Sequence, residues 1–141
     1  MKRAVIILIM ISVMGIFSMT ACASKSEFGL KDFSEYKDMN TEIIKIKVEW
    51  DVGTGEPIEF LIEDADDMDF IKGKLLDKQA FTQSDSGVDA GFGSMVITSV
   101  DNKDTRVSLS QIHSNGKYYV YSTDEIYEYI KAIGIKQGVL S

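Results

Sequence analysis

The segment from Ile44 to Val52 constrains the fold most, because apolar and charged residues alternate along it without a break. Ile44, Ile46, Val48, Trp50 and Val52 stand at every second position, and lysine, glutamate or aspartate fills the positions between them. Successive side chains of a β-strand point to opposite faces of the sheet, so this pattern predicts a strand with one buried and one exposed face. We therefore expect Ile46 and Trp50 to lie in the core.

Further periodic segments predict the rest of a small domain. We expect strands over 58–62, 95–100, 107–109 and 117–121, and helices over about 64–77 and 122–134. Asp64 or Asp66 can cap the first helix. In the last helix, Ser122 and Glu125 have the spacing of a capping box, and Gly134 is placed as the glycine that follows a helix. The order ββαβββα predicts an α+β fold of two layers, with helices packed on one face of an antiparallel sheet.

The long polar stretch Lys78–Gly93 is the first candidate site. A connection of this length without periodicity of its own is usually functional or mobile. Ser84, Asp85 and Asp89 bring side-chain oxygens close together in sequence. We interpret the stretch either as a segment that binds a ligand or partner, or as a plain connection. A loose calcium site at Asp85 and Asp89 is a further option.

Tyrosines form the second candidate site. Tyr119 and Tyr121 share one face of the last strand, opposite to Tyr118, and Tyr127 lies off the apolar stripe of the last helix. Tyrosine is frequent in recognition surfaces, so Tyr119, Tyr121 and Tyr127 are candidates for a surface that binds a partner. The alternative is that these tyrosines only cover a half-buried sheet.

Patterns typical of catalysis or of bound cofactors are largely missing. The acidic run at 63–69 lacks the glycine and the twelfth-position glutamate of an EF-hand loop. Gly91-Phe92-Gly93-Ser94 precedes a strand rather than a helix, which does not fit a dinucleotide-binding loop. The only histidine, His113, precedes a tight turn and is expected to be exposed. We predict no enzyme activity, no metal and no cofactor, although a carboxylate pair for glycoside cleavage stays open.

The N-terminus has the arrangement of an export signal. Lys2 and Arg3 precede an uncharged apolar run, and small residues lead to Cys22, the only cysteine. The ending Met19-Thr20-Ala21-Cys22 resembles the bacterial lipobox, in which signal peptidase II cuts before a cysteine that carries diacylglycerol; leucine is usual where Met19 stands. A retained anchor helix or ordinary secretion is the alternative. With Cys22 modified, no cysteine is left for a disulfide or a thiolate metal site.

In its layout the chain resembles the small single-domain lipoproteins of Gram-positive bacteria. We expect a signal peptide at 1–21, a lipid-anchored tether at 22–40 and a single domain at 41–141. The resemblance implies an outward-facing protein of the cell membrane, held by lipid on Cys22, that acts as a non-enzymatic protein-interaction or accessory module. The alternative is a lipoprotein that binds a small ligand or a cell-wall glycan.

The charge of the chain argues against one class of partner. Residues 1–21 contain two of the 15 basic residues and none of the 22 acidic ones, so the remaining 120 residues have a formal charge of −9. Nucleic acids are bound by surfaces rich in lysine and arginine. We therefore expect no nucleic-acid partner.

Overall fold

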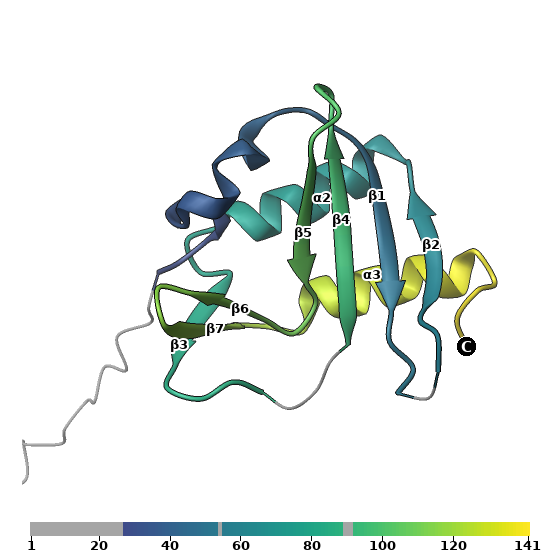
Figure 1. Cartoon of the computed structure of the whole chain (residues 1–141). Coiled ribbons are helices and arrows are strands. Elements are labelled where there is room, and N and C mark those ends of the chain that lie inside the picture. The colour runs from purple at the N-terminus through teal and green to yellow at the C-terminus, as the bar shows by residue number, and fades with distance from the viewer. Residues whose placement is uncertain (1–26, 54, 89–91) are drawn as a thin grey trace, which may run out of the picture.

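Two antiparallel sheets and two α-helices make up the computed structural model, which describes residues 27–53, 55–88 and 92–141 (Figure 1). The predicted α+β class with antiparallel strands is confirmed. One sheet has the order β2-β1-β4-β5 and consists of β1 (Ile43–Trp50), β2 (Ile58–Ile62), β4 (Gly93–Ser99) and β5 (Asp104–Ser108). The other has the order β3-β7-β6 and consists of β3 (Phe81–Ser84), β6 (Gln111–Ser114) and β7 (Lys117–Tyr121). The helices are α2 (Ala65–Leu76), α3 (Glu125–Lys136) and two 3-10 helices, η1 (Leu30–Asp32) and η2 (Ser34–Asn40).

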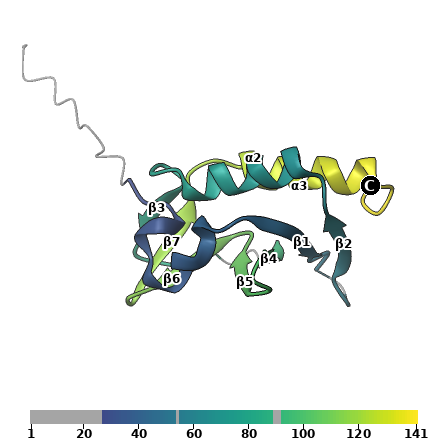
Figure 2. The same cartoon turned by 90° about the horizontal axis from the view of Figure 1, so that it is seen from above.

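Both α-helices cover the same face of the four-stranded sheet, as Figure 2 shows. β1 lies inside this sheet and pairs with β2 and β4. Ile46 and Trp50 are buried in the core, as predicted. Ile44, however, is 43% exposed, because the register of β1 against β4 shifts at this residue. The alternating pattern therefore gives the correct face for the middle of the strand but not for its first residues.

The predicted order ββαβββα lacks two strands, β3 and β6. β3 lies within the 78–93 stretch, so that stretch is not a loop throughout, and β6 lies just before the Asn115-Gly116 turn. Each has four residues and one buried apolar side chain, Phe81 or Ile112. A segment of this length is too short to reveal a period of apolar and polar residues. Because β7 pairs with both strands, a second sheet exists where a single sheet was expected.

Residues 27–40, expected to belong to a tether, pack onto the domain instead. Leu30, Phe33 and Met39 are buried in the core cluster. Phe28 forms an isolated antiparallel bridge with Phe81 of β3. The apolar spacing here fits no single helix, because the chain is extended at Phe33 between the two 3-10 helices. The folded part therefore begins well before residue 41.

α2 forms where it is predicted. The Asp64 carboxylate accepts hydrogen bonds of 3.1 Å from the backbone N–H groups of Asp66 and Asp67, which otherwise have no partner in the first turn. Met68 and Ile71 are buried against the sheet. The cap and the apolar stripe together explain why this segment is helical.

The ends of α3 differ from the prediction. The Ser122 hydroxyl lies 2.9 Å from the Thr82 hydroxyl and caps nothing, and the helix begins after Asp124. Gly134 lies inside the helix, where a Cβ atom would come within 2.5 Å of Leu140 Cδ1, so close packing rather than helix termination explains this glycine. The residue that follows the helix end with a positive φ, of 73°, is Gly138.

Gly93 allows β4 to start close against β1. Its φ is 105°, a value that residues with a side chain rarely adopt, and a Cβ atom would overlap the carbonyl oxygen of Glu49. Gly73 is the opposite case, because it lies in α2 with open space where its Cβ would be. The two glycines therefore respond differently to the same substitution.

We expect Gly93→Ala to lower the free energy of unfolding by about 2 kcal/mol or more, through backbone strain and the overlap with Glu49. Gly73→Ala, the matched control, should raise it by about 0.5–1 kcal/mol because alanine favours the helix. Urea unfolding followed by circular dichroism measures both changes. Equal midpoints for Gly93→Ala and the parent protein would show that β4 does not begin in this conformation.

Candidate functional site

Of the three oxygen-bearing candidates in the 78–93 stretch, the structure describes Ser84 and Asp85. Ser84 ends β3, and its hydroxyl donates to the backbone carbonyl of Ser86 at 2.7 Å. Asp85 is exposed, and Asp89 lies outside the described residues. In the part of the chain that the structure describes, no group of three or more His, Cys, Asp or Glu side chains could hold a metal ion.

Part of the same stretch is held firmly against the second sheet. The Val88 N–H donates to the side-chain oxygen of Gln111 at 2.8 Å, and the Gln111 amide donates back to the Val88 carbonyl at 3.4 Å. Gln111 belongs to β6, a strand that the sequence pattern does not reveal. These bonds join the stretch to β6, and its mobility stays a prediction.

The three candidate tyrosines do not share a surface. Tyr119 is 7% exposed and belongs to the core, with its ring centroid 4.7 Å from that of Phe33 and 5.1 Å from that of Phe28. Its assignment to a binding surface is wrong, because the segment taken for a tether covers it. Tyr121 and Tyr127 are half-buried and lie at a different place.

Tyr121 and Tyr127 line one pocket of about 360 Å³, together with two residues of the 78–93 stretch, Val88 and Phe92. The remaining lining residues are Leu109, Ser110, Val120, Thr123, Asp124 and Glu128. Val88 and Phe92 are each 40% exposed, so apolar surface is open to solvent at the pocket. Most of its lining residues come from the connection between β3 and β4, the end of β7 and the first turn of α3, and Figure 1 shows where these elements lie.

Ring contacts form the aromatic wall of this pocket. The Tyr127 ring stacks on that of Trp50 at a centroid distance of 4.6 Å and makes a tilted contact with that of Phe92 at 4.8 Å. The Tyr121 hydroxyl donates to the Ser108 carbonyl at 2.6 Å, and burial raises the pKa of Tyr121. These contacts fix both tyrosines, so the wall exists before any ligand binds.

The backbone around Gly93 determines where Phe92 points. The Phe92 carbonyl accepts a hydrogen bond of 3.3 Å from the Asp51 N–H, just beyond β1. The Gly93 carbonyl accepts one of 2.9 Å from the Leu109 N–H, which brings Leu109 to the same pocket. The close approach that requires glycine at 93 therefore also assembles this side of the pocket.

The pocket is acidic. Among the described residues, no basic side chain pairs with Asp124 or Glu128, whereas neighbouring Glu125 forms an ion pair with Lys74 at 2.8 Å. Burial, followed by the charges of Glu128 and Asp124, raises the pKa of Tyr127. The Tyr127 hydroxyl therefore stays protonated at neutral pH, and the negative charge of the pocket comes from the two carboxylates.

A second hollow of about 330 Å³ lies beside Tyr121 but has a different character. Its lining includes the ion pair of Lys74 with Glu125 and the paired hydroxyls of Thr82 and Ser122. Asp77 is the one acid of this lining without an ion pair among the described residues, against two such acids, Asp124 and Glu128, in the acidic pocket.

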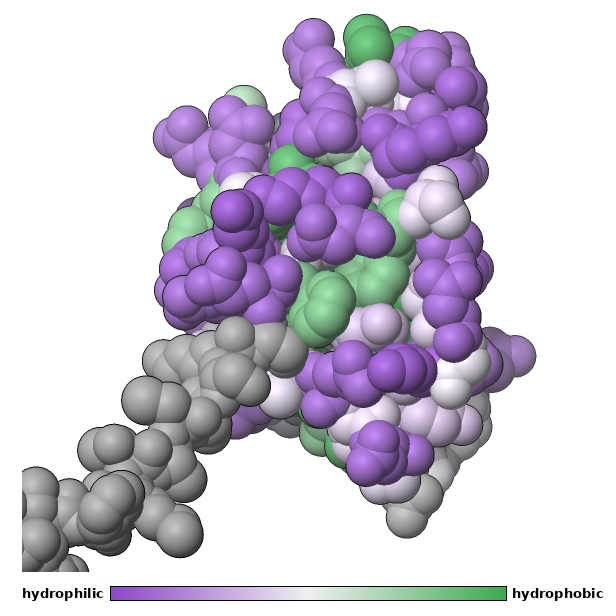
Figure 3. Space-filling view, turned by 90° about the vertical axis from the view of Figure 1, so that its left-hand side faces the viewer, coloured by the Kyte–Doolittle hydropathy of each residue, from purple (hydrophilic) through white to green (hydrophobic). Residues whose placement is uncertain are grey.

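Figure 3 shows the side where η1, η2 and the second sheet lie, with several apolar areas separated by hydrophilic ones. Large apolar side chains away from the pocket, such as Val100 and Ile135, are also exposed. His113 is exposed, as predicted, and its ring lies 4.8 Å from that of Tyr118. Neither this apolar surface nor the contact of His113 with Tyr118 offers a pocket with an aromatic, apolar and acidic lining.

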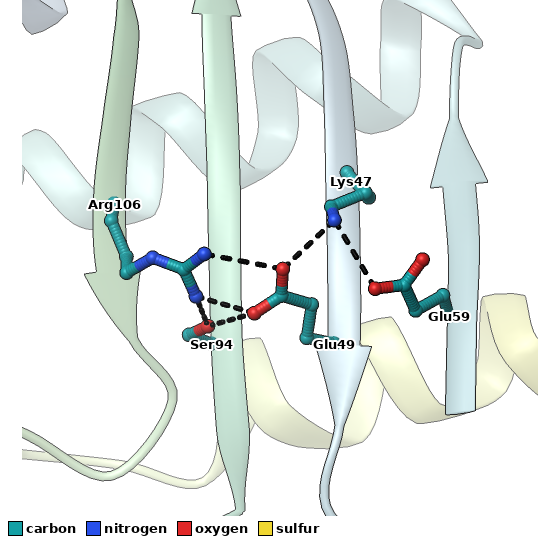
Figure 4. A network of polar contacts seen from close by, with 5 residues as sticks. All are labelled: Lys47, Glu49, Glu59, Ser94 and Arg106. Carbon is teal, nitrogen blue, oxygen red and sulfur yellow. Dashed lines mark hydrogen bonds and ion pairs between the residues drawn. The ribbon is translucent and has the colours of Figure 1, made fainter. Parts of the chain in front are cut away.

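An ordered row of charges crosses the open face of the four-stranded sheet (Figure 4). Lys47 Nζ lies 2.8 Å from Glu49 and 3.2 Å from Glu59. Arg106 reaches Glu49 from β5, with one contact of 3.2 Å, and the Ser94 hydroxyl donates to Glu49 at 3.0 Å. Opposite charges thus alternate across three strands, and each is paired within the sheet.

This network is poorly suited to acid–base catalysis. Hydrogen bonds from Arg106 and Lys47 lower the pKa of Glu49 from 4.5 to about 2. Its carboxylate therefore has no proton to donate at neutral pH and is a weak base, far from the pKa near 7 that favours proton transfer. The network instead covers the open face with charges that neutralise one another.

Sequence reasoning named two residues of the pocket, Tyr121 and Tyr127, and the candidate stretch 78–93 contains two more, Val88 and Phe92, which were not singled out. Phe92 stands between two glycines in a segment without a period, so no pattern marks it. Asp124 and Glu128 look like ordinary acids in the first turn of a helix, where they favour the helix dipole. Their lack of basic partners is visible only in the folded chain.

No protein-family model, curated protein or solved structure matches this chain. None of the helices in the described ranges is long and apolar enough to cross a membrane. Cys22 lies outside those ranges. A function for the protein is therefore proposed from the pocket and from the sequence.

The charge network gives a testable pH dependence. The pKa of Glu49 is lower in the folded protein than its ordinary value of 4.5, so its stabilising effect is complete above pH 4.5 and is lost as the pH falls toward 2. We expect Glu49→Gln to lower the free energy of unfolding at pH 7 by about 1 kcal/mol. The difference from the parent should shrink between pH 4.5 and 2, as measured by urea unfolding.

Glu63→Gln is the control, since Glu63 is exposed and forms no ion pair among the described residues. Its effect on stability should be small and should change little over the same pH range. A constant difference between Glu49→Gln and the parent from pH 7 to pH 2 would contradict the network.

Proposed function

We propose that the protein is a lipid-anchored, outward-facing binding protein of the cell membrane, which acts without catalysis and recognises a segment of a protein partner. The observation that supports this most is the pocket formed by Val88, Phe92, Tyr121 and Tyr127. It unites the two candidate sites, because a tyrosine from β7 and one from α3 meet the stretch between β3 and β4. Aromatic and apolar walls with a few polar groups are typical of recognition sites.

The rigid construction of the pocket favours binding. Trp50 supports Tyr127 from behind, Ser108 holds the Tyr121 hydroxyl, and Gln111 holds both backbone groups of Val88. A partner that binds in such a site loses conformational entropy of its own. No further entropy is lost in ordering the side chains of the pocket. Preformed walls of this kind give affinity without a large contact area.

The sequence supports a lipid anchor at Cys22. The number of residues between Cys22 and the first residues that pack on the domain limits the distance between the membrane and the domain. Phe28 already belongs to the domain, through its bridge to β3. Five residue steps separate Cys22 from Glu27, and such a length of chain spans at most about 18 Å when fully extended. Diacylglycerol supplies two acyl chains, which are sufficient for stable anchoring. The pocket would therefore meet partners at or near the membrane surface.

A small ligand or cell-wall glycan is the second candidate occupant. The volume of about 360 Å³ is near the lower end of ordinary small-molecule sites, which start at about 300 Å³. The same volume also accommodates one or two side chains of a protein partner. The two candidates differ in the size of the bound molecule, and the crosslinking experiment below measures that difference.

Lipid attachment depends on a single residue. Because Cys22 is the only cysteine, Cys22→Ser should abolish labelling by an alkyne-tagged fatty acid and should block processing by signal peptidase II. Click labelling and gel electrophoresis of whole cells measure both effects. Equal labelling of the variant and the parent would refute the lipoprotein assignment.

Site-specific crosslinking tests the pocket. A photoreactive p-benzoylphenylalanine at position 88, at the pocket, should form an adduct of protein size in native membranes. The same replacement at Val100, which is 54% exposed and does not line the pocket, is the matched control and should give little product. Tyr127→Ala should lower the yield at position 88.

The adduct distinguishes the candidates. A small mass increase at position 88, without a band of protein size, would favour the small ligand or glycan. Equal adducts from positions 88 and 100, unaffected by Tyr127→Ala, would show that the pocket is not the binding site.

A further inference from the structure

We propose that the pocket accepts a basic side chain, lysine or arginine, carried by an apolar segment of the partner. This inference rests on the proposed function and adds the chemistry of the occupant. Two carboxylates, Asp124 and Glu128, line the pocket, and none of the described residues that line it is basic. Apolar side chains, Val88 and Phe92, stand exposed at the same place. A positive charge flanked by apolar groups complements both features.

Asp124 and Glu128 have no basic partner among the described residues, so their carboxylates can bind a cation. Their position at the start of α3 does not explain why they lack such a partner. Acids in a first turn compensate the helix dipole, and Glu125 of the same turn does so while paired with Lys74. Asp124 makes no side-chain hydrogen bond to the helix end. The charges of Asp124 and Glu128 therefore act on the pocket, and they reach the Tyr127 hydroxyl, whose pKa they help to raise.

The aromatic wall adds a second attraction for a cation. Lysine and arginine bind over aromatic faces when the charge lies within about 6 Å of the ring centre. Phe92 is 40% exposed, and its ring lies 4.8 Å from that of Tyr127, which is stacked on Trp50. The same protein already contains such a contact, with Lys74 Nζ 5.5 Å from the centre of the Phe70 ring. A basic side chain in the pocket would meet carboxylates and rings together.

The overall charge of the chain assists the encounter. Residues 22–141 carry a formal charge of −9, and a surface of one sign attracts opposite charges from a distance. On the open sheet face, by contrast, the acids Glu49 and Glu59 are already paired with Lys47 and Arg106. The open sheet face therefore competes less for a basic segment than the pocket does, since Asp124 and Glu128 have no basic partner among the described residues.

Fluorescence provides a direct test, because Trp50 is the only tryptophan and stacks on Tyr127. The full chain, in detergent micelles, is titrated with acetyl-Leu-Lys-Leu-amide, with acetyl-Leu-Glu-Leu-amide and with n-butylamine. We expect a saturable change in Trp50 emission with the lysine peptide and affinities at least about tenfold lower for the other two. Added salt should weaken the binding of the lysine peptide.

Variants assign the effect to the two acids. The double variant Asp124→Asn, Glu128→Gln should weaken binding of the lysine peptide by about tenfold. Glu125→Gln removes one charge from the same helix turn but belongs to the hollow on the other side of Tyr121, so it should change the affinity less than about twofold. Circular dichroism confirms that all variants are folded.

Each contrary result overturns a defined part of the proposal. Equal affinity for the lysine and glutamate peptides would refute the preference for a base and leave the proposed pocket function standing. Binding of n-butylamine as tight as that of the lysine peptide would show a site for small amines instead of peptides. No change in Trp50 emission with any of the three compounds, together with a protein adduct at position 88, would refute the basic occupant but not the pocket.

Discussion

The packing of the inner face of β1 is the constraint on which the rest of the structure depends. Ile46 and Trp50 are buried there, and both α-helices lie over this face of the sheet. β1 also pairs with two strands, so its register fixes theirs. At the end of β1, Trp50 stacks on Tyr127 of α3 and thereby forms the support of the pocket wall. The core and the candidate site are thus built from the same strand.

The pocket forms where the two sheets meet, and each sheet contributes a fixed part. β6 of the second sheet holds Val88 through Gln111, and the close start of β4 in the first sheet positions Phe92. Tyr121, at the end of β7, connects the two parts by its hydrogen bond to Ser108 at the end of β5. The shape of a pocket at such a junction depends on the positions of both sheets.

Charge is distributed differently over the two faces. On the open face of the four-stranded sheet, Lys47, Glu49, Glu59 and Arg106 neutralise one another, which leaves little net field for a partner. At the pocket, Asp124 and Glu128 have no basic partner among the described residues and lie beside exposed apolar side chains. Acids elsewhere, such as those at 63–69, also form no ion pair in the described ranges, so the pocket differs from them by combining carboxylates with exposed aromatic and apolar side chains.

The sequence by itself determined the elements that carry a clear period. The β1 alternation, the capped stripe of α2 and the β7 segment after Asn115-Gly116 each follow from local rules of strand, helix and turn, so the α+β class could be predicted. Asn115 and Gly116 indeed have φ values of 52° and 74°, as such a turn requires.

Only the tertiary structure decided where the short and irregular segments go. β3 and β6 have one buried apolar side chain each, and Phe92 has no periodic neighbours, so nothing local fixes them. Tyr119 became core and Tyr127 a pocket wall because residues distant in sequence, Phe33 and Trp50, cover them. The physical reason is that periodicity in the sequence encodes which face of a helix or strand is apolar. Which element packs against that face is decided by tertiary contacts, and these form only when the chain folds.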